Sequence, residues 1–417
     1  MYSHINRSIC FVILDDNGGG IRTVTSMIAS AVNSNSVLAV KLVVLRKSSG
    51  WLSSLNLNVE LVLLDSPRPS EDSFYFLQWL NIEKPNHIFL NGCWSIYEFL
   101  PLISRLTLVS LVVHDFLWSN IKPALVYCDS LYSIVAVSQI VDSSIRAHTS
   151  SPLILSKLRL INNGISIDYC RIIKDRLPTL TLSFFGGAEQ RKGAFFLRRL
   201  LPVLCSRFNH SITLYWAGSE IPLTVLHVLE SLPLLEVVRL GNITHLEVES
   251  ILAKSSILLV PSYREAFGMV ILEAIKCGCI PIAWDLPGGP QQILSSDPLF
   301  KDISLVPPFN LQAYCSKIIQ AYVGARDIDY CFQQLLDLYS IDITSQGYVN
   351  LVVDSSPYFF DPPSQTLSLP YLYANPSCKH INFLSFIRYV FNQLMIVSET
   401  ISPALYHRLH LLFYVRL

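Results

Sequence analysis

Short continuous runs of Val, Ile and Leu, separated by longer amphipathic stretches, are the feature that most limits how this chain can fold. Continuous apolar runs are typical of strands covered on both faces, as in parallel sheets. Strands that alternate with helical stretches predict βα units and a doubly wound sheet. In the first half of the chain the expected strands are Ile9–Leu14, Ala39–Leu45, Leu61–Leu64, His87–Leu90, Leu108–Val113 and Ile134–Val137, with helices such as Ile21–Val32 and Phe74–Asn81 between them.

A second series of the same construction follows a break near Lys174–Pro178. Its expected strands are Thr181–Phe185, Ser211–Trp216, Val237–Leu240, Ile257–Val260 and Ile280–Ala283, and its expected helices are Ala194–Phe208, His245–Ala253, Met269–Cys277 and Leu311–Tyr322. A length of 417 residues fits two domains of this kind. We therefore expect an N-terminal Rossmann-like domain over residues 1–175, a C-terminal Rossmann-like domain over 176–330, and an extension of unknown role over 331–417.

The extension differs in composition from the two βα series. Asp354–Pro370 is rich in Ser and Pro, and its prolines interrupt any helix. Phe383–Leu417 returns to aromatic and aliphatic residues. Two interpretations of this last segment stay open: helices packed on the N-terminal domain, or a surface in contact with a membrane or a partner.

Composition excludes some classes of function. The formal net charge is zero and only 15% of the residues are charged, so we expect no nucleic-acid partner. Mean hydropathy is high, at +0.42, but no apolar run approaches the roughly 18–20 residues of a spanning helix. The apolar run Ile9–Leu14 is shorter than the roughly 7–15 residues of a signal-peptide core, and we interpret it as a buried strand.

The ten cysteines are scattered and form no C-x-x-C pair, which fits a reducing cytoplasm. We therefore expect a cytoplasmic protein, and the apolar extension is compatible with peripheral contact at the inner face of a membrane. Cys277 and Cys279 are close in sequence, but no second close pair accompanies them as a structural zinc site would require. We single out no carboxylate cluster as a metal site, and we expect no metal and no cofactor.

Two glutamates, Glu265 and Glu273, lie with seven residues between them. The second lies in the apolar segment Met269–Ile275, where burial of a lone carboxylate costs several kcal/mol unless a donor hydrogen-bonds it. A sugar or ribose hydroxyl is one natural donor, and a buried lysine is another. For Glu265 the alternative to a ligand contact is an ordinary loop carboxylate near a helix start.

Three further groups could meet a ligand. Gly19 and Gly20 follow the first strand and open a helix, as at an anion site or in a simple tight turn. Arg191 and Lys192 precede the helix from Ala194, where two cations are unfavourable without a counter-ion such as a diphosphate, unless solvent covers them on a surface turn. His114 follows the strand Leu108–Val113, so it is either a ligand contact at a strand end or a satisfied histidine in a turn.

The order of these features resembles a known family. An apolar strand, a loop with Glu265, the pair Phe267-Gly268, a helix with Glu273 and a Gly288-Gly289-Pro290 turn resemble the family-4 retaining glycosyltransferases, the glycosyl transferases group 1. The resemblance covers roughly residues 9–325. It implies an α/β chain of GT-B architecture, in which two Rossmann-like doubly wound domains face a cleft, with an atypical C-terminal extension.

The resemblance also implies roles. His114 and Glu265 would act at the reaction centre, the first near the C6 hydroxyl of the donor sugar. Glu273 would bind the ribose hydroxyls and Lys192 the diphosphate. The expected donor-binding residues are Gly19, Gly20, Arg191, Lys192, Ile243, Phe267, Gly268, Met269, Val270 and Glu273.

The chain departs from the family pattern at several positions. Gly187 stands where the family has an arginine, and Arg191 is the candidate to replace it. Asn91 stands in place of a strand-end histidine, and Gln292 in place of a glutamate. These departures keep open a second function, a non-catalytic GT-B scaffold that binds a sugar or a partner enzyme.

The function implied by the resemblance is retaining transfer of a hexosyl group from a nucleotide-sugar donor to a hydroxyl of a glycan or lipid-linked acceptor, in polysaccharide or glycoconjugate synthesis. A nucleotide-sugar epimerase of similar fold is a rival within the enzymes. It lacks the loop that contains the two glutamates, so the transferase is the preferred interpretation.

Overall fold

The computed structural model describes residues 7–17, 19–47, 52, 57–167, 179–208, 210–324 and 329–355, which form two compact units. The first unit contains the described residues up to Gly164 together with Ile341–Ser355, and the second contains those from Ile165 to Ser340. The segment Phe383–Leu417, for which two interpretations were open, lies outside the described residues.

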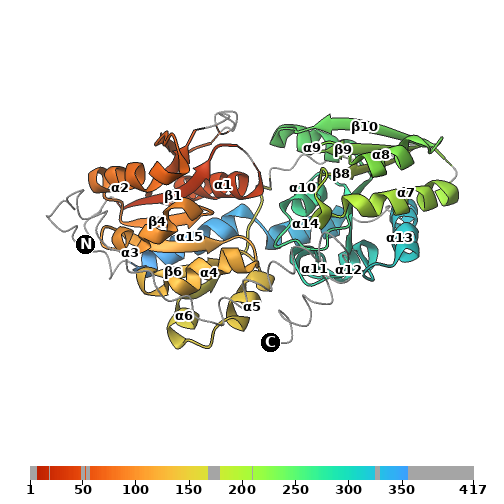
Figure 1. Ribbon diagram of the computed structural model, residues 1–417. Helices are drawn as coiled ribbons and strands as arrows, with labels where there is room; N and C mark the ends of the chain where they lie inside the picture. The colour runs from red at the N-terminus through yellow and green to blue at the C-terminus, as the bar shows by residue number, and fades with distance from the viewer. Residues whose placement is uncertain are drawn as a thin grey trace. The chain divides into compact units, whose positions relative to one another are not determined.

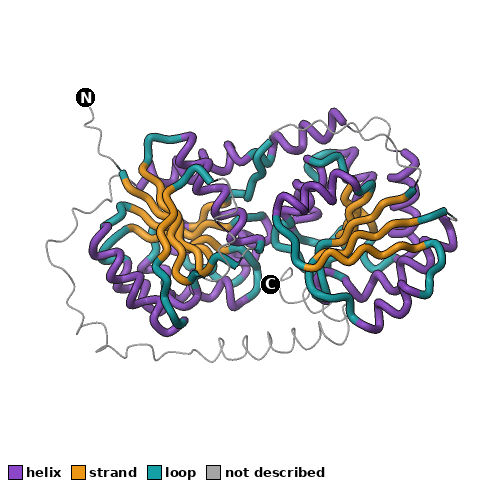
Figure 2. Tube along the Cα trace, turned by 90° about the horizontal axis from the view of Figure 1, so that it is seen from above, coloured by secondary structure: helices purple, strands orange, loops and turns teal. Residues whose placement is uncertain are grey.

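The first unit is built on a seven-stranded parallel sheet in the order β3-β2-β1-β4-β5-β6-β7. The central strands are buried along their whole length because helices cover both faces of the sheet (Figure 2). The strands are β1 Ser8–Asp15, β2 Ala39–Arg46, β3 Glu60–Leu63, β4 His87–Asn91, β5 Leu108–Val113, β6 Ser133–Ala136 and β7 Leu158–Leu160 (Figure 1).

The helices of the first unit connect these strands in the βα manner expected from the sequence. The α-helices are α1 Gly20–Asn35, α2 Asp72–Glu83, α3 Leu100–Ile103, α4 Trp118–Val126, α5 Gln139–Ala147, α6 Pro152–Lys157 and, from a distant part of the chain, α15 Ile341–Ser355. Short 3-10 helices are η2 Pro69–Glu71, η3 Trp94–Phe99 and η4 Cys128–Ser130.

The second unit contains a six-stranded parallel sheet in the order β10-β9-β8-β11-β12-β13. Its strands are β8 Leu180–Phe184, β9 Ile212–Ala217, β10 Leu235–Gly241, β11 Ile257–Val260, β12 Ile280–Trp284 and β13 Leu305–Val306. Its helices are η5 Gln190–Lys192, α7 Ala194–Phe208, α8 Leu223–Glu230, α9 His245–Lys254, α10 Met269–Lys276, α11 Gly289–Leu294, α12 Pro298–Ser304, α13 Leu311–Gly324 and α14 Asp329–Leu338.

The predicted fold class, an α/β chain with two Rossmann-like parallel sheets, is confirmed. Each predicted strand corresponds to a strand of the structure within about two residues. Sequence analysis missed β7 and β13, which are edge strands of three and two residues. Strands of two or three residues are too short to contain the apolar run by which the others are recognised.

Each sheet has one point at which the strand order reverses. In the first unit β1 lies beside both β2 and β4, and in the second unit β8 lies beside both β9 and β11. Connections leave these neighbouring strands toward opposite faces, so a crevice opens beyond their carboxyl ends, where ligands of open α/β sheets bind. The two reversal points therefore mark where functional residues are expected in each unit.

Helix α15 returns to the first unit after the chain has completed the second. It packs beside α1 (Figure 1). The Tyr348 ring lies edge-on to the rings of Phe11 and Phe89, with centroids 5.4 and 5.1 Å away. Thr344 Oγ1 donates to the carbonyl of Asn162 at 2.9 Å. The described residues of the expected extension therefore belong to different units. Helix α14 packs on α10 of the second unit, and α15 packs on the first unit.

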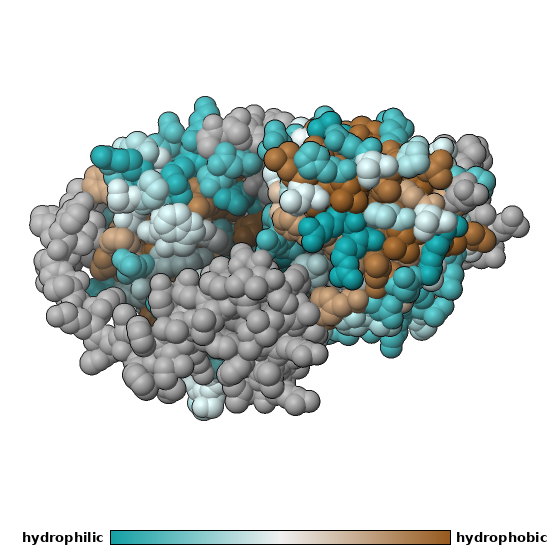
Figure 3. All heavy atoms as spheres, turned by 45° about the vertical axis from the view of Figure 1, so that its right-hand side comes forward, coloured by the Kyte–Doolittle hydropathy of each residue, from teal (hydrophilic) through white to brown (hydrophobic). Residues whose placement is uncertain are grey.

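On the face of the second unit seen in Figure 3, apolar side chains are interspersed with polar ones. Among the described residues, no helix combines the length and the apolar character that crossing a membrane would require.

The first prediction concerns α15. Tyr348 is 1% exposed, so Tyr348→Ala removes a buried ring between two strands and should lower the free energy of unfolding by about 3–5 kcal/mol. Ile343→Ala on the same helix is the matched control, because its side chain is 58% exposed and should change stability by less than about 0.5 kcal/mol. Urea unfolding followed by circular dichroism measures both; equal effects would contradict the packing of α15 on the first sheet.

Candidate functional site

A small pocket lies at the carboxyl ends of β8 and β11, at the strand-order reversal of the second unit. The end of β8, the loop after β11 and the start of α10 form its walls. Its lining residues are Phe184, Phe185, Gly186, Lys192, Leu258, Leu259, Val260, Ser262, Glu265, Gly268 and Val270. Four of them, Lys192, Glu265, Gly268 and Val270, are predicted site residues that stand up to 78 positions apart in sequence.

Lys192 and Glu265 form an ion pair in this pocket, with the Lys192 Nζ donating to Glu265 Oε2. Burial by itself raises the pKa of the Glu265 carboxyl, but the positive charges of Lys192, Arg191 and Arg264 outweigh it and hold the pKa below its usual value. The carboxylate is therefore ionised at neutral pH. A partly buried cation and anion together present both a hydrogen-bond donor and an acceptor to a ligand in the pocket.

Backbone packing fixes the loop that contains Glu265. The Tyr263 N–H donates to the Arg191 carbonyl at 2.8 Å, and the Gly289 N–H donates to the Glu265 carbonyl at 2.9 Å. A Cβ at Gly289 would lie 1.8 Å from the Phe267 carbonyl oxygen, closer than any real contact, so only glycine lets these two segments meet. The Gly-Gly turn seen in the sequence is thus a support for the Glu265 loop.

The start of α10 completes the pocket. Gly268 caps the helix in a left-handed conformation, with φ of 89°, and Met269 and Val270 form its first turn. The first backbone N–H groups of a helix have no partner within the helix, so they are available to oxygen atoms of a ligand. The Phe267 side chain does not serve the pocket, because it is buried in the core with its ring edge-on to Tyr339 at 5.9 Å.

Gly187 occupies the position at which the family has an arginine, and Arg191 is the residue expected to replace that arginine. The Arg191 Nε lies 2.8 Å from Glu189 Oε2 in an ion pair. Gly187 is left-handed, with φ of 50°, and a Cβ there would lie 2.5 Å from the Ser219 nitrogen. The backbone of this turn is therefore closed to an arginine at position 187, and Arg191 is the nearest guanidinium in sequence.

Glu273 lies in a separate buried cluster on the next turns of α10. Its Oε1 is 3.7 Å from the His245 Nδ1, while Glu249 Oε1 accepts from the Lys276 Nζ at 2.9 Å. Burial, and then the negative charge of Glu249, raise the pKa of Glu273 to about 7, with Lys276 acting in the opposite direction. Lys276 thus pairs with Glu249, and Glu273 keeps a carboxyl that is partly protonated near neutral pH.

Ile243 belongs to the same region. It is half-buried in the loop between β10 and α9, two residues before His245. Burial lowers the pKa of His245, although Glu249 opposes this, so the ring facing Glu273 is neutral at pH 7. The structure therefore places Ile243 two residues from His245, whose ring faces Glu273.

In the first unit, Gly19 and Gly20 lie at the N-terminus of α1. Gly19 is the N-cap and no side chain caps the helix there. A Cβ built at either glycine meets nothing within 4 Å, so the space in front of the helix is open. An open, uncapped helix N-terminus at the carboxyl end of β1 is compatible with an anion, and equally with a simple turn.

His114 and Asn91 are hydrogen-bonded at the carboxyl ends of β5 and β4, with 2.9 Å between Nε2 and Oδ1. Asn91 Nδ2 donates to the Phe89 carbonyl, so Oδ1 must accept and the His114 Nε2 must carry the proton. Burial lowers the pKa of His114 to about 4, which keeps the ring neutral and leaves the Nδ1 lone pair as its acceptor. Asn91, a departure from the family pattern, here fixes the tautomer of His114.

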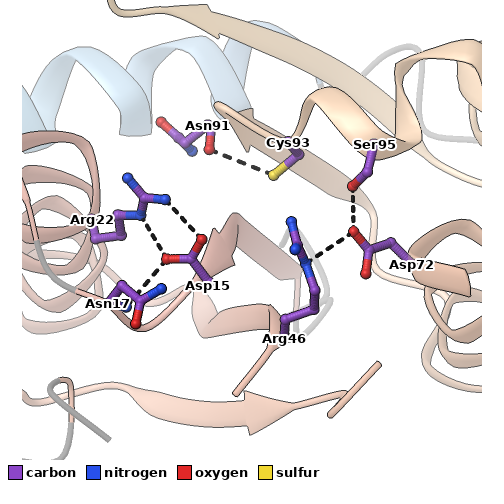
Figure 4. A network of polar contacts seen from close by, with 8 residues as sticks. All are labelled: Asp15, Asn17, Arg22, Arg46, Asp72, Asn91, Cys93 and Ser95. Carbon is purple, nitrogen blue, oxygen red and sulfur yellow. Dashed lines mark hydrogen bonds and ion pairs between the residues drawn. The ribbon is translucent and has the colours of Figure 1, made fainter. Parts of the chain in front are cut away.

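The sequence analysis did not predict two ion pairs that the first unit contains (Figure 4). Arg22 donates to both carboxylate oxygens of Asp15, at 3.0 and 2.8 Å, and Arg46 Nε lies 3.3 Å from Asp72 Oδ2. Asp15 and Arg46 are the last residues of β1 and β2. Polar residues directly after continuous apolar runs were the available signal, but only the sheet order shows that these two strand ends are neighbours.

The second prediction tests the support of the Glu265 loop. Gly289→Ala forces a Cβ against the Phe267 carbonyl and should cost about 1–3 kcal/mol of stability. Gly324→Ala is the matched control, since its Cβ meets nothing within 4 Å and the residue ends α13, so stability should stay equal or rise slightly. Thermal unfolding distinguishes the two; a Gly289 variant as stable as the control would contradict the close approach.

The third prediction concerns Glu273. Its folded pKa of about 7 exceeds the ordinary 4.5, so the folded protein holds a proton that the unfolded chain releases, and stability falls as pH rises through this interval. Glu273→Gln removes the titration and should be more stable than the native chain at about pH 8, by up to about 3 kcal/mol, with little difference at about pH 4.

Glu247→Gln is a control of opposite sign. Hydrogen bonds from the Thr244 backbone and side chain lower the pKa of the Glu247 carboxylate, so its contribution is present at neutral pH and lost in acid. Denaturant titrations across the pH range measure both variants. A Glu273→Gln difference that is constant with pH would show that the Glu273 pKa is unperturbed.

Comparison with known proteins gives a family-model match over part of the chain, and a fold. Residues 179–323 match the family model described as Glycosyl transferases group 1. None of the curated proteins compared with this chain matches it.

Several solved structures share its architecture. HepE from Anabaena, in complex with UDP and glucose, is 15% identical with a TM-score of 0.64, over 84% of this chain and 100% of that one. Sucrose-phosphate synthase from Thermosynechococcus elongatus is 15% identical with a TM-score of 0.66, over 84% and 100%. The pneumococcal O-GlcNAc transferase GtfA, in complex with UDP and GlcNAc, is 12% identical with a TM-score of 0.65, over 84% and 99%.

At these identities the solved structures establish the fold alone, which is that of GT-B glycosyltransferases. The pocket with Lys192 and Glu265 lies inside the matched residues 179–323. The second unit of this chain therefore contains the region that matches the family model described as Glycosyl transferases group 1.

Proposed function

We propose that the protein is a retaining glycosyltransferase that moves a hexosyl group from a nucleotide-sugar donor to a hydroxyl of a glycan or lipid-linked acceptor. The observation that supports this most is the pocket at the β8/β11 reversal, where Lys192, Glu265 and the start of α10 converge within the matched family region. The solved GT-B structures that resemble this chain include complexes with UDP together with glucose or GlcNAc.

The donor diphosphate would be held by Lys192, Arg191 and the N–H groups of Gly268, Met269 and Val270. As the bond from the sugar to the nucleotide breaks, negative charge grows on the departing phosphate, and fixed cations and helix ends stabilise it. Lys192 is paired with Glu265 in the protein without donor. When the donor binds, the Lys192 ammonium must exchange the Glu265 carboxylate for phosphate oxygens, and this exchange consumes part of the binding free energy. Glu265 is then free to accept from hydroxyls of the transferred sugar.

Glu273 and Ile243 would hold the nucleoside. A carboxyl with a pKa of about 7 is an acceptor for ribose hydroxyls when ionised and a donor when protonated. In the first unit, His114 would contact the sugar through its neutral ring, with Asn91 fixing the protonated nitrogen. No metal enters this scheme, because the cations that meet the phosphate are side chains of the protein. We place the protein in the cytoplasm, with contact to a membrane surface through a lipid-linked acceptor.

The alternative, a non-catalytic scaffold, is favoured by the closed backbone at Gly187, which rules out the family arginine at that position. The two functions differ in one measurable respect, which is turnover of the donor. A scaffold binds a sugar or a partner enzyme without hydrolysing or transferring the donor.

The fourth prediction tests donor binding. Thermal shifts with a panel of UDP-, GDP- and ADP-sugars should reveal at least one donor that raises the melting temperature by mass action. Lys192→Ala should weaken that donor about 10- to 100-fold, since hydrogen bonds to charged groups are worth about 1.5–3 kcal/mol. Lys254→Ala is the matched control, because it removes an exposed positive charge from the same unit, at the end of α9.

The identified donor is then used for turnover. Proton NMR of the released or transferred sugar reports its anomeric configuration, which should equal that of the donor, and chelation of metals with EDTA should leave the rate unchanged. No shift with any donor would contradict the proposal. Binding without turnover would favour the scaffold, and an inverted product would refute retention.

A further inference from the structure

The strand-order reversal of the first unit holds a second cluster that the donor scheme does not use (Figure 4). Asp15 and Arg46 end the adjacent strands β1 and β2, Asp72 opens α2, and Trp94 and Ser95 follow β4. Four segments therefore bring polar and aromatic side chains to the carboxyl edge of one sheet, which is where ligands of open α/β sheets bind.

Asp72 is the buried centre of this cluster. The residue has no exposed surface, and its Oδ2 accepts from the Ser95 hydroxyl and faces the Arg46 Nε at 3.3 Å. The Asp72 Oδ1, and the Nε and Nη2 of Arg46, are buried without a hydrogen-bond partner. Buried polar atoms in native proteins are nearly always hydrogen-bonded, so an incompletely satisfied ion pair at a sheet edge is a group that a bound water or a ligand would complete.

Trp94 lies over this ion pair and is open to solvent. Its side chain is 59% exposed, and the Arg46 guanidinium carbon lies 5.7 Å from the centre of the indole ring. The Arg46 guanidinium thus pairs with Asp72 and lies over the Trp94 ring. A flat aromatic surface beside a few fixed polar groups is the usual composition of a site for a small organic ligand.

The charges of the cluster select the class of ligand. Arg22 is paired with Asp15 and Arg46 with Asp72, so each cation already has its own carboxylate. Asp16, which is also buried, follows Asp15, and the exposed Lys47 follows Arg46, so the described charges at these two strand ends balance. With no surplus of positive charge, a phosphate or carboxylate group would gain little here, whereas a neutral ligand rich in hydroxyls can donate to carboxylates and accept from guanidinium groups.

We propose that this edge of the first unit, formed by Trp94, Arg46 and Asp72, binds a neutral pyranose ring of the acceptor. The C–H face of the sugar packs on the Trp94 indole, and its hydroxyls hydrogen-bond with the Arg46 guanidinium, which Asp72 and Ser95 hold in place. The assignment rests on the proposed transferase and deepens it, because it makes the acceptor a glycan with an uncharged sugar at this position.

Ligand-observed saturation-transfer NMR on the full chain tests the site, with maltose, cellobiose, lactose and chitobiose as neutral probes and glucose 6-phosphate and glucuronic acid as anionic ones. At least one neutral disaccharide should bind with a dissociation constant at or below about 10 mM, the weak end of specific affinities. Trp94→Ala should weaken that probe at least about 10-fold and Trp94→Phe less, since a smaller aromatic face remains.

Ile82→Ala, which removes an exposed apolar side chain from the same unit, should leave binding unchanged. Equal binding by Trp94→Ala and the native chain, tighter binding of an anionic probe, or no binding of any neutral disaccharide would each overturn the proposal. The donor thermal shift is measured on the same variants. A donor shift retained in Trp94→Ala with loss of the disaccharide separates this site from the donor site, and a missing donor shift refutes the transferase without altering the NMR result.

Discussion

The contact between Lys192 and Glu265 is the interaction on which the candidate site depends. The two side chains come from segments that leave different strands, η5 after β8 and the loop after β11, so their ion pair exists only because those strands are neighbours. Because Gly289 has no side chain, its turn approaches the Glu265 loop closely. Its N–H donates to the Glu265 carbonyl, and its backbone packs against the Phe267 carbonyl. The placement of the Glu265 carboxylate beside Lys192 thus depends on a residue without a side chain, Gly289.

The surroundings of the two glutamates shift their carboxyl pKa values in opposite directions. Glu265 is surrounded by three cations and stays ionised, whereas Glu273, eight residues further along, has a carboxylate neighbour and a pKa of about 7. Two carboxyl groups with separated pKa values can perform different tasks in one site, as a charged acceptor and as a group that can also donate. The neutral His114, fixed by Asn91, adds a third polar group with a defined protonation state.

Both sheets use the same architectural rule for their polar residues. Each unit has ion pairs beyond the carboxyl ends of the strands where the order reverses, at β8/β11 in the second unit and at β1/β2/β4 in the first. The two clusters differ in charge balance. In the first, Arg22 and Arg46 each pair with one carboxylate. In the second, Lys192, Arg191 and Arg264 outnumber the carboxylates of Glu265 and Glu189. This difference is the physical basis for assigning a neutral ligand to one and a phosphate-bearing ligand to the other.

The sequence by itself determined the βα rhythm, because continuous apolar runs report burial on both faces. It located every described strand except β7 and β13, and it located the helices α1, α2, α7, α9, α10 and α13. It also singled out Lys192, Glu265 and Glu273 through motif order. It could not find β7 and β13, which are too short to form an apolar run, or the return of α15 to the first unit, which depends on packing between Tyr348 and two distant strands. Nor could it pair Arg46 with Asp72 or Asn91 with His114, because such contacts between strand ends are decided by strand order, and strand order is a property of the tertiary structure alone.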